Sequence, residues 1–229
     1  MKDKTALIIG GFGGIGLATA RLLSQEGITT LVTYHKKKKD IDKVDAYEMD
    51  VTNKKSVDSC IDSIIKRYKN IDIVVFSVSS EFAYRGINEC SWEDFQKHID
   101  VQLKGFFLVI QALKPLIDKK YPMHFIVLLT EACEGKPPAM MSHYITAKYG
   151  LMGFVKCMVS ELSRNNCTFD MVSPGMVKTD LLKNVPEKIL EMEAYKSPKG
   201  RLTKPEEVAN EILFLISGKA DDNNNGVPQ

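Results

Sequence analysis

The sequence has little of the features that mark several specialised classes of protein. Only five of its 229 residues are cysteines, and none of them forms a C-x-x-C pair or clusters with the four histidines. Scattered thiols in an odd number are typical of a reduced intracellular protein, so we expect a cytoplasmic location and neither a disulfide framework nor a metal site. The cysteines are Cys60, Cys90, Cys133, Cys157 and Cys167.

Long apolar runs and an excess of charge are also absent. No segment approaches the roughly 18 apolar residues of a membrane helix, and the opening MKDKTALIIGG has too brief an apolar run for a signal peptide. The formal net charge is only +2, which gives no electrostatic argument for nucleic acid or membrane as a partner. With 44% hydrophobic and 26% charged residues, the composition predicts one globular domain over residues 1–229.

Short apolar runs alternate with longer segments of helical period, a pattern typical of a doubly wound α/β fold. We therefore expect a Rossmann-like parallel sheet in a single domain. The predicted strands are about Thr5–Ile9, Thr29–Tyr34, Asp45–Met49, Ile71–Phe76, Phe125–Leu129 and Thr168–Val172. The predicted helices are about Ile15–Glu26, Lys54–Tyr68, Trp92–Ile117, Tyr144–Ser163 and Pro205–Ser217. The polar stretch between Tyr34 and Asp50 leaves little room for a crossover helix.

The glycines in IIGGFGGIG, residues 8–16, fit two nucleotide-binding patterns. Gly11, Gly13 and Gly16 match G-x-G-x-x-G, whereas Gly10, Gly14 and Gly16 match G-x-x-x-G-x-G. In either case a turn with few β-carbons lets the backbone approach a pyrophosphate at the amino end of the following helix. The stretch alone does not decide between them.

Downstream, Tyr144 and Lys148 are spaced to lie on one helix face. A lysine ammonium beside a phenol favours the phenolate, so the pair predicts a lowered pKa for Tyr144. Such a pair can pass a proton to or from a carbonyl oxygen while a hydride moves at carbon. The spacing is common by chance in exposed helices. The neighbouring His143 diverges from Tyr144 on the helix, and we expect it to face solvent.

Several motifs occur together in one order. They are the glycine turn, MDVT (residues 49–52), YITAK (144–148), VSPGMVKTDLL (172–182) and GRLTKPEEVA (200–209). With this combination the chain resembles the classical short-chain dehydrogenases/reductases over essentially its whole length, most closely the 3-oxoacyl-carrier-protein reductase-like branch. The resemblance implies that Gly10, Gly14 and Gly16 form the working pattern, and that the chain is a homodimer or a homotetramer.

The resemblance also implies roles for individual residues. Tyr144 is the proton donor, and Lys148 is its electrostatic partner and a ligand of the nicotinamide ribose. From their composition, the charged stretch of about residues 175–200 is predicted to be a lid of marginal helix, which the resemblance places over the substrate, and the polar residues 218–229 are predicted to form a flexible tail. The implied cofactor-binding residues are Gly10, Phe12, Gly13, Gly14, Ile15, Gly16, Tyr34, His35, Lys36, Asp50, Val51, Ser77, Tyr144, Lys148, Pro174, Gly175, Val177 and Thr179.

The chain departs from the family pattern at several positions. The catalytic serine of the family falls at Glu131, although its neighbour Thr130 carries a hydroxyl, and the relay asparagine falls at Gln102. The usual N-N-A-G is F-S-V-S (residues 76–79), and the seventh strand is missing or reduced to GVPQ. An ionised Glu131 would oppose the negative charge that forms during carbonyl reduction, so a protonated Glu131 or the Thr130 hydroxyl must supply a donor.

The cofactor can be argued from charge at the end of the second strand. Proteins of this type that select NAD place a carboxylate there, but this chain has Tyr34, His35, Lys36 and Lys37, and lysines continue to Lys39. Ammonium groups can offset a 2′-phosphate, so we expect NADP(H). The predicted function is NADPH-dependent reduction of a carbonyl in a 3-oxoacyl thioester or a keto-sugar-like substrate, either carrier-bound or free. The alternative is a silenced relative that binds a dinucleotide as a sensor or scaffold.

Overall fold

The computed structural model describes residues 1–36, 40–81 and 84–218. Its centre is a six-stranded parallel sheet in the order β3-β2-β1-β4-β5-β6. The strands are β1 (Thr5–Ile9), β2 (Thr29–Tyr34), β3 (Val44–Glu48), β4 (Ile73–Phe76), β5 (Met123–Leu128) and β6 (Cys167–Val172). β1 and β4 are buried on both faces, as continuous runs such as IVVF predict for a parallel sheet.

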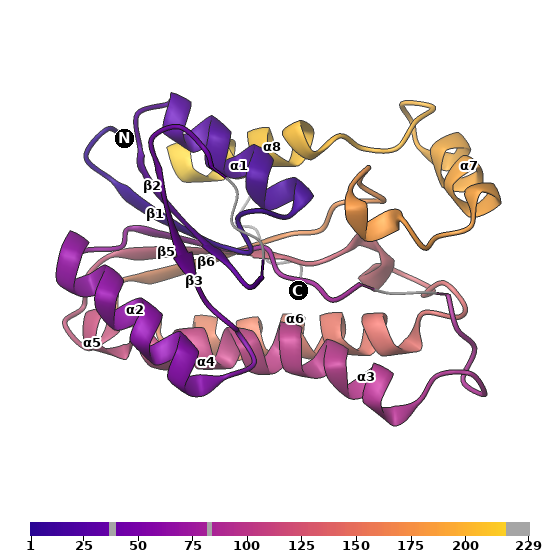
Figure 1. Ribbon diagram of the computed structural model, residues 1–229, viewed down its shortest axis with the longest axis horizontal. Coiled ribbons are helices and arrows are strands. Elements are labelled where there is room, and N and C mark those ends of the chain that lie inside the picture. The colour runs from indigo at the N-terminus through magenta and orange to yellow at the C-terminus, as the bar shows by residue number, and fades with distance from the viewer. Residues whose placement is uncertain (37–39, 82–83, 219–229) are drawn as a thin grey trace.

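Helices cover both faces of the sheet (Figure 1). On one face lie α1 (Gly14–Gln25) and α8 (Pro205–Ser217), which pack against each other. The other face carries α2 (Lys54–Tyr68), α3 (Trp92–His98), the π-helix η1 (Ile99–Lys104), α4 (Gly105–Ala112), α5 (Lys114–Ile117) and α6 (Ser142–Glu161). Two apolar clusters fill the layers between sheet and helices, so the chain folds as one doubly wound domain.

The strand and helix predictions agree with the structure to within a few residues, with one correction. The predicted helix over Trp92–Ile117 is not continuous, because it is interrupted by η1 and again before Pro115. Proline lacks a backbone N–H and clashes with the preceding turn, which explains the second break. The first break is a wider turn of a kind often found at functional sites.

The crossover between β2 and β3 contains no helix in its described residues, 35–36 and 40–43, in line with the short polar connection. Within the described part of the chain, no strand follows β6. The predicted tail beyond Gly218, including GVPQ, lies outside the described residues, as do Lys37 to Lys39. None of the described helices is long and apolar enough to span a bilayer.

The segment between β6 and α8 contains the 3-10 turn η3 (Asp180–Leu182) and α7 (Glu187–Lys196). Figure 1 shows α7 beyond one end of the sheet, apart from the two helical layers. The segment returns to the body of the domain through a β-bridge between Val177 and Thr203. Tyr195 on α7 is 89% exposed, so this helix packs only lightly.

Candidate active site and dinucleotide cleft

The predicted site residues gather at one edge of the sheet, because each segment directly follows a strand. Parallel strands end at the same edge, where open α/β sheets bind ligands. The glycine turn follows β1, His35 follows β2, Asp50 follows β3, Ser77 follows β4, and Thr130 and Glu131 follow β5. Pro174 to Thr179 follow β6 and lie across this edge.

Four glycines of this turn leave no room for a β-carbon. One on Gly16 would lie 2.3 Å from the carbonyl oxygen of Gly10, and one on Gly11 would lie 2.4 Å from Cβ of Val32. Gly10 has a φ of +84°, and a β-carbon on it would lie 2.8 Å from the carbonyl oxygen of Ser77. A β-carbon on Gly14 would lie 2.2 Å from the methyl carbon of Thr179, whereas one on Gly13 would meet nothing closer than 3.4 Å. Every glycine of G-x-x-x-G-x-G is therefore closely packed, whereas the alternative pattern includes the tolerant Gly13, and this difference favours G-x-x-x-G-x-G. The turn leads into the amino end of α1, whose free N–H groups attract anions.

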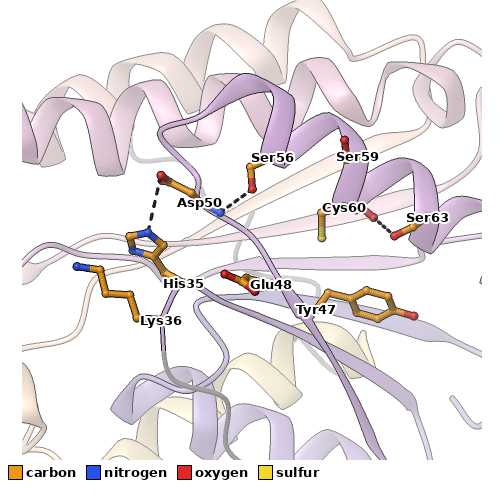
Figure 2. A pocket seen from close by; sticks show the side chains of 9 residues that line it. All are labelled: His35, Lys36, Tyr47, Glu48, Asp50, Ser56, Ser59, Cys60 and Ser63. Carbon is orange, nitrogen blue, oxygen red and sulfur yellow. Dashed lines mark hydrogen bonds and ion pairs between the residues drawn. The ribbon is translucent and has the colours of Figure 1, made fainter.

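A shallow cavity of about 710 Å³ lies at the ends of β2 and β3, beside α2 (Figure 2). Asp50 is fixed there by its own backbone, since its N–H donates to the Ser56 hydroxyl at 3.0 Å. The N–H and the hydroxyl of Thr52 donate to its carboxylate at 2.9 and 2.8 Å. Burial raises the pKa of Asp50, but the Thr52 bonds and the charges of His35 and Lys104 outweigh it, and the net pKa is lowered. Asp50 is therefore a fixed anionic acceptor.

His35 and Lys36 enter the same cavity from the end of β2 (Figure 2). The Nε2 atom of His35 lies 3.8 Å from the carboxylate of Asp50. Beside them, the ring of Tyr34 stacks on Phe12 of the glycine turn, with ring centroids 5.6 Å apart. The structure thus brings the ends of β1, β2 and β3 together, with two basic side chains at the outer rim.

A second cavity, of about 730 Å³, joins the glycine turn to the ends of β4, β5 and β6. Tyr144 and Lys148 both line it, and both are at least 93% buried, with exposures of 7% and 3%. The Nζ atom of Lys148 lies 5.8 Å from the centroid of the Tyr144 ring and donates to the carbonyl oxygen of Leu128 at 2.6 Å. The helical spacing therefore places the two side chains together in a buried position.

The prediction of a lowered pKa for Tyr144 is wrong for this environment. Burial raises the pKa of the phenol above its ordinary value of 10, and this effect exceeds the lowering by a hydrogen bond from Thr130. Burial also lowers the pKa of Lys148 from 10.5 to about 8. The sequence showed the spacing of the pair but not its desolvation, which disfavours both charged forms.

The two residues after β5 take different positions. Thr130 hydrogen-bonds Tyr144 through its hydroxyl, which also accepts from the backbone N–H of Ala132 at 3.3 Å. The Glu131 carboxylate lies against Gly175, where a β-carbon would come within 2.8 Å of it. Burial, with the facing carboxylates of Glu193 and Glu134, raises the pKa of Glu131. The hydroxyl beside Tyr144 is therefore that of Thr130.

The remaining predicted residues line the cavity from the segment after β6. Pro174, Gly175, Val177 and Thr179 all do so, and Thr179 also covers Gly14. From α7, Glu193 and Lys196 reach the same space and form an ion pair of 2.7 Å. Ile15 and Ser77 line the opposite wall. Val51 is buried against Gly105, and Gly16 packs on the carbonyl of Gly10.

Behind Tyr144 lies a buried polar cluster that the sequence did not reveal. His143 is only 2% exposed, so the prediction that it faces solvent is wrong. Its ring meets that of His98 edge-on at 4.8 Å, and His98 lies edge-on to Tyr144 at 6.0 Å. The amide of Gln102, within η1, lies 3.3 Å from Nδ1 of His98. α3 and η1 pack directly on α6, which explains the burial of its first turn.

Comparison with known proteins agrees with this architecture. A family model described as enoyl-(acyl carrier protein) reductase matches residues 10–222. The 3-oxoacyl-[acyl-carrier-protein] reductase FabG of Thermotoga maritima is 31% identical over 234 residues, covering 96% of this chain and 93% of the relative. That of Rickettsia felis is 32% identical over 228 residues, covering 96% and 92%.

Two solved structures share the fold over nearly the whole chain. The 3-ketoacyl-(acyl-carrier-protein) reductase of Brucella melitensis, complexed with NADH, has a TM-score of 0.86 at 21% identity and coverages of 95% and 92%. The aldohexose dehydrogenase of Thermoplasma acidophilum has a TM-score of 0.82 at 25% identity and coverages of 93% and 86%. The matches in sequence and fold extend over both the glycine turn and the Tyr144–Lys148 pair. The chain therefore belongs to the short-chain dehydrogenase/reductase family of oxidoreductases.

Proposed function

We propose that this chain is an NADPH-dependent reductase of a carbonyl compound, with Tyr144 as the proton donor. The observation that carries the proposal is the hydrogen bond of Tyr144 to Thr130, next to Lys148, inside a cavity that also reaches the glycine turn. Binding of a nucleotide alone requires no buried phenol. A phenol with a supporting hydroxyl is suited to give a proton to an oxygen that gains charge.

The residues present fit a nicotinamide dinucleotide. Gly10 and Gly14 stand where a β-carbon would lie within 2.8 Å of atoms in another segment of the chain, and α1 begins at this turn. The turn and the amino end of α1 would hold the pyrophosphate, Asp50 and Val51 the adenine, and Lys148 the nicotinamide ribose. When bound, the reduced nicotinamide supplies the hydride.

Tyr144 keeps its proton at neutral pH because burial raises the pKa of the phenol. As the carbonyl oxygen gains charge, Tyr144 donates this proton, and the Thr130 hydroxyl stabilises the phenolate that is left. The Lys148 ammonium favours the same phenolate through its charge. The substrate and cofactor cavity is closed on one side by the segment over residues 175–200, which serves as the lid.

The preference for NADPH rests on the charges at the end of β2. No carboxylate lies at the end of β2 itself. The two acids that line the cavity, Glu48 and Asp50, come from the end of β3 and the residues after it, and Asp50 lies 3.8 Å from His35. His35 and Lys36 present basic groups at the rim of the shallow cavity beside α2, which would hold the adenosine. The Lys36 ammonium offsets a 2′-phosphate, whereas the ribose diol of NAD would find no acid on β2.

The relatives support a carbonyl substrate of one of two kinds. The names of the Thermotoga maritima and Rickettsia felis relatives state a 3-oxoacyl group on an acyl carrier protein. The name of the Thermoplasma acidophilum protein states an aldohexose. We therefore screen 3-oxoacyl thioesters and sugars that carry a carbonyl group, keto-sugars included.

One observation favours a second candidate, a silenced relative that binds the dinucleotide as a sensor or scaffold. Glu131 stands where the family has serine, and a carboxylate there repels an oxyanion. Under this alternative the chain binds NADPH but reduces nothing, and Glu131→Ser gives it activity.

NADPH oxidation in the presence of carbonyl compounds tests the proposal. The wild type should turn over, and Tyr144→Phe should lower kcat at least about 1,000-fold with NADPH affinity nearly intact. Tyr149→Phe is the matched control, because this hydroxyl on the same helix bonds the backbone of Cys133 instead. Binding of NADH tenfold or more tighter than NADPH would remove the NADPH assignment, and an active Tyr144→Phe variant would remove the proton donor.

A further inference from the structure

The Glu131 carboxylate lies in the catalytic cavity beside other carboxylates. The charged groups that act on it are the carboxylates of Glu193 and Glu134, which also line the cavity. Among residues 1–36, 40–81 and 84–218, no lysine, arginine or histidine forms an ion pair with Glu131. The nearby Lys196 pairs with Glu193 at 2.7 Å. An ionised group that is partly desolvated and faces like charges needs hydrogen-bond donors from elsewhere.

The backbone of Glu131 is fixed, and its carboxylate lies against Gly175. The Glu131 backbone N–H donates to the carbonyl oxygen of Pro174 at 3.1 Å, which ties the end of β5 to the segment after β6. Both carboxylate oxygens lie within 2.9 Å of the place where Gly175 would carry a β-carbon. Only a glycine at 175 leaves that space, so the acid group lies flat against the backbone on the wall it shares with Tyr144.

Thr130 and Glu131 have different roles in the site. The Thr130 hydroxyl is engaged with Tyr144, at the point where a carbonyl oxygen would be protonated. Glu131, one residue further on, is an acceptor that lines the same cavity. In an α-hydroxy ketone the hydroxyl oxygen lies beside the carbonyl oxygen, at the separation of neighbouring substituents. Such a substrate can accept from Tyr144 and donate to Glu131 at once.

We infer that Glu131 selects substrates that carry a hydroxyl group on the carbon next to the reacting carbonyl, as keto-sugars do. This inference rests on the proposed reductase function and names its substrate class. A 3-oxoacyl thioester has a methylene group on each side of the ketone and no donor for Glu131. Glu131 is partly exposed, so the discrimination comes from one hydrogen bond to a charged acceptor and is expected to be about tenfold or somewhat more.

Hydroxyacetone and butanone form the deciding pair of probes, since they differ only by a hydroxyl in place of a methyl group. With NADPH, the wild type should show kcat/KM at least about tenfold higher for hydroxyacetone. Glu131→Ser should reduce this ratio to below about threefold, with Glu131→Gln intermediate because its amide keeps one acceptor oxygen. Glu161→Gln, at the exposed end of α6, is the charge-matched control and should keep the wild-type ratio.

Equal kcat/KM for the two probes, or an unchanged ratio in Glu131→Ser, would overturn the inference while the reductase function stands. If the wild type reduces neither probe nor an acetoacetyl thioester, the proposed function fails. The role of Glu131 is then tested by the binding of hydroxyacetone. In that case saturation-transfer NMR on the NADPH-bound protein should still show hydroxyacetone binding that Glu131→Ser loses. Equal binding of hydroxyacetone and butanone would overturn it.

Discussion

The Nζ atom of Lys148 lies 2.6 Å from the backbone carbonyl oxygen of Leu128, to which it donates a hydrogen bond. The bond holds the ammonium at the end of β5, beside the ring of Tyr144. A carbonyl acceptor favours the charged amine, but complete burial opposes it more strongly and lowers the pKa of Lys148 to about 8. The charge state of Lys148 therefore changes close to physiological pH.

This titration predicts the pH dependence of turnover. Below a pH of about 8 Lys148 is protonated, and as the pH rises through this value the ammonium that supports Tyr144 is lost. Since the pKa of Tyr144 is raised, its phenol keeps its proton over the same range and causes no fall in activity of its own. We expect kcat/KM, which reports the free enzyme, to fall above about pH 8 when measured up to about pH 10. A flat profile, or the same fall in the residual activity of Lys148→Met, would contradict the assignment.

The hydroxyl of Thr130 gives a second prediction. Thr130→Val keeps the shape of the side chain but removes the hydrogen bond to Tyr144, and it should lower kcat by about 100- to 1,000-fold. Thr130→Ser retains the hydroxyl and should stay within about tenfold of the wild type. NADPH affinity should change little in either variant, which separates loss of chemistry from loss of folding. If Thr130→Val is as active as Thr130→Ser, the donor lies elsewhere.

The sequence predicted the sheet well because its strands are short apolar runs, such as IVVF in β4, that occur between segments of helical period. It also located the site, since parallel strands place the residues that follow them at one edge. Gly10, Asp50 and Thr130 come together for this reason alone. The family pattern supplied the roles, but the arrangement itself follows from topology.

Properties that depend on packing between helices were not predictable. His143 and Tyr144 are adjacent in sequence and were expected to diverge, yet η1 and α3 cover both sides of the first turn of α6. The same burial reverses the expected shift in the pKa of Tyr144. The interruption of the helix at η1 also had no signal, because the apolar residues around Gln102 continue with a regular period.

The buried imidazole of His98 predicts a loss of stability in acid. Burial is the main cause that lowers its pKa from 6.5 to about 4, and His143, Lys97 and Lys148 add to the lowering, whereas Asp94 opposes it. Between these pH values His98 binds a proton in the unfolded chain but not in the folded chain, so the free energy of unfolding falls as pH decreases. The full difference corresponds to about 3 kcal/mol.

Denaturant unfolding at several pH values from about 7 to about 4 measures this effect. His98→Leu removes the titrating group, so its unfolding free energy should fall less steeply in acid than that of the wild type. The lowered pKa of His143 acts in the same direction, and the double variant should be flatter still. An unchanged slope in both variants would show that other groups dominate acid unfolding.

The outer face of α4 and α6 predicts association of this chain with a second copy. Phe107 on α4 is 43% exposed and its ring meets that of Phe154 on α6 at 5.9 Å, while Val159 on α6 is 37% exposed. Large apolar side chains grouped on two adjacent helices are costly in water and typical of an interface. Light scattering at micromolar concentration should show at least a dimer, and Phe107→Glu should yield a monomer by placing a charge in the apolar contact. Tyr195→Glu is the matched control, because this aromatic side chain on α7 is 89% exposed and lies away from that face. A monomeric wild type, or a Phe107→Glu variant of unchanged mass, would refute association through these helices.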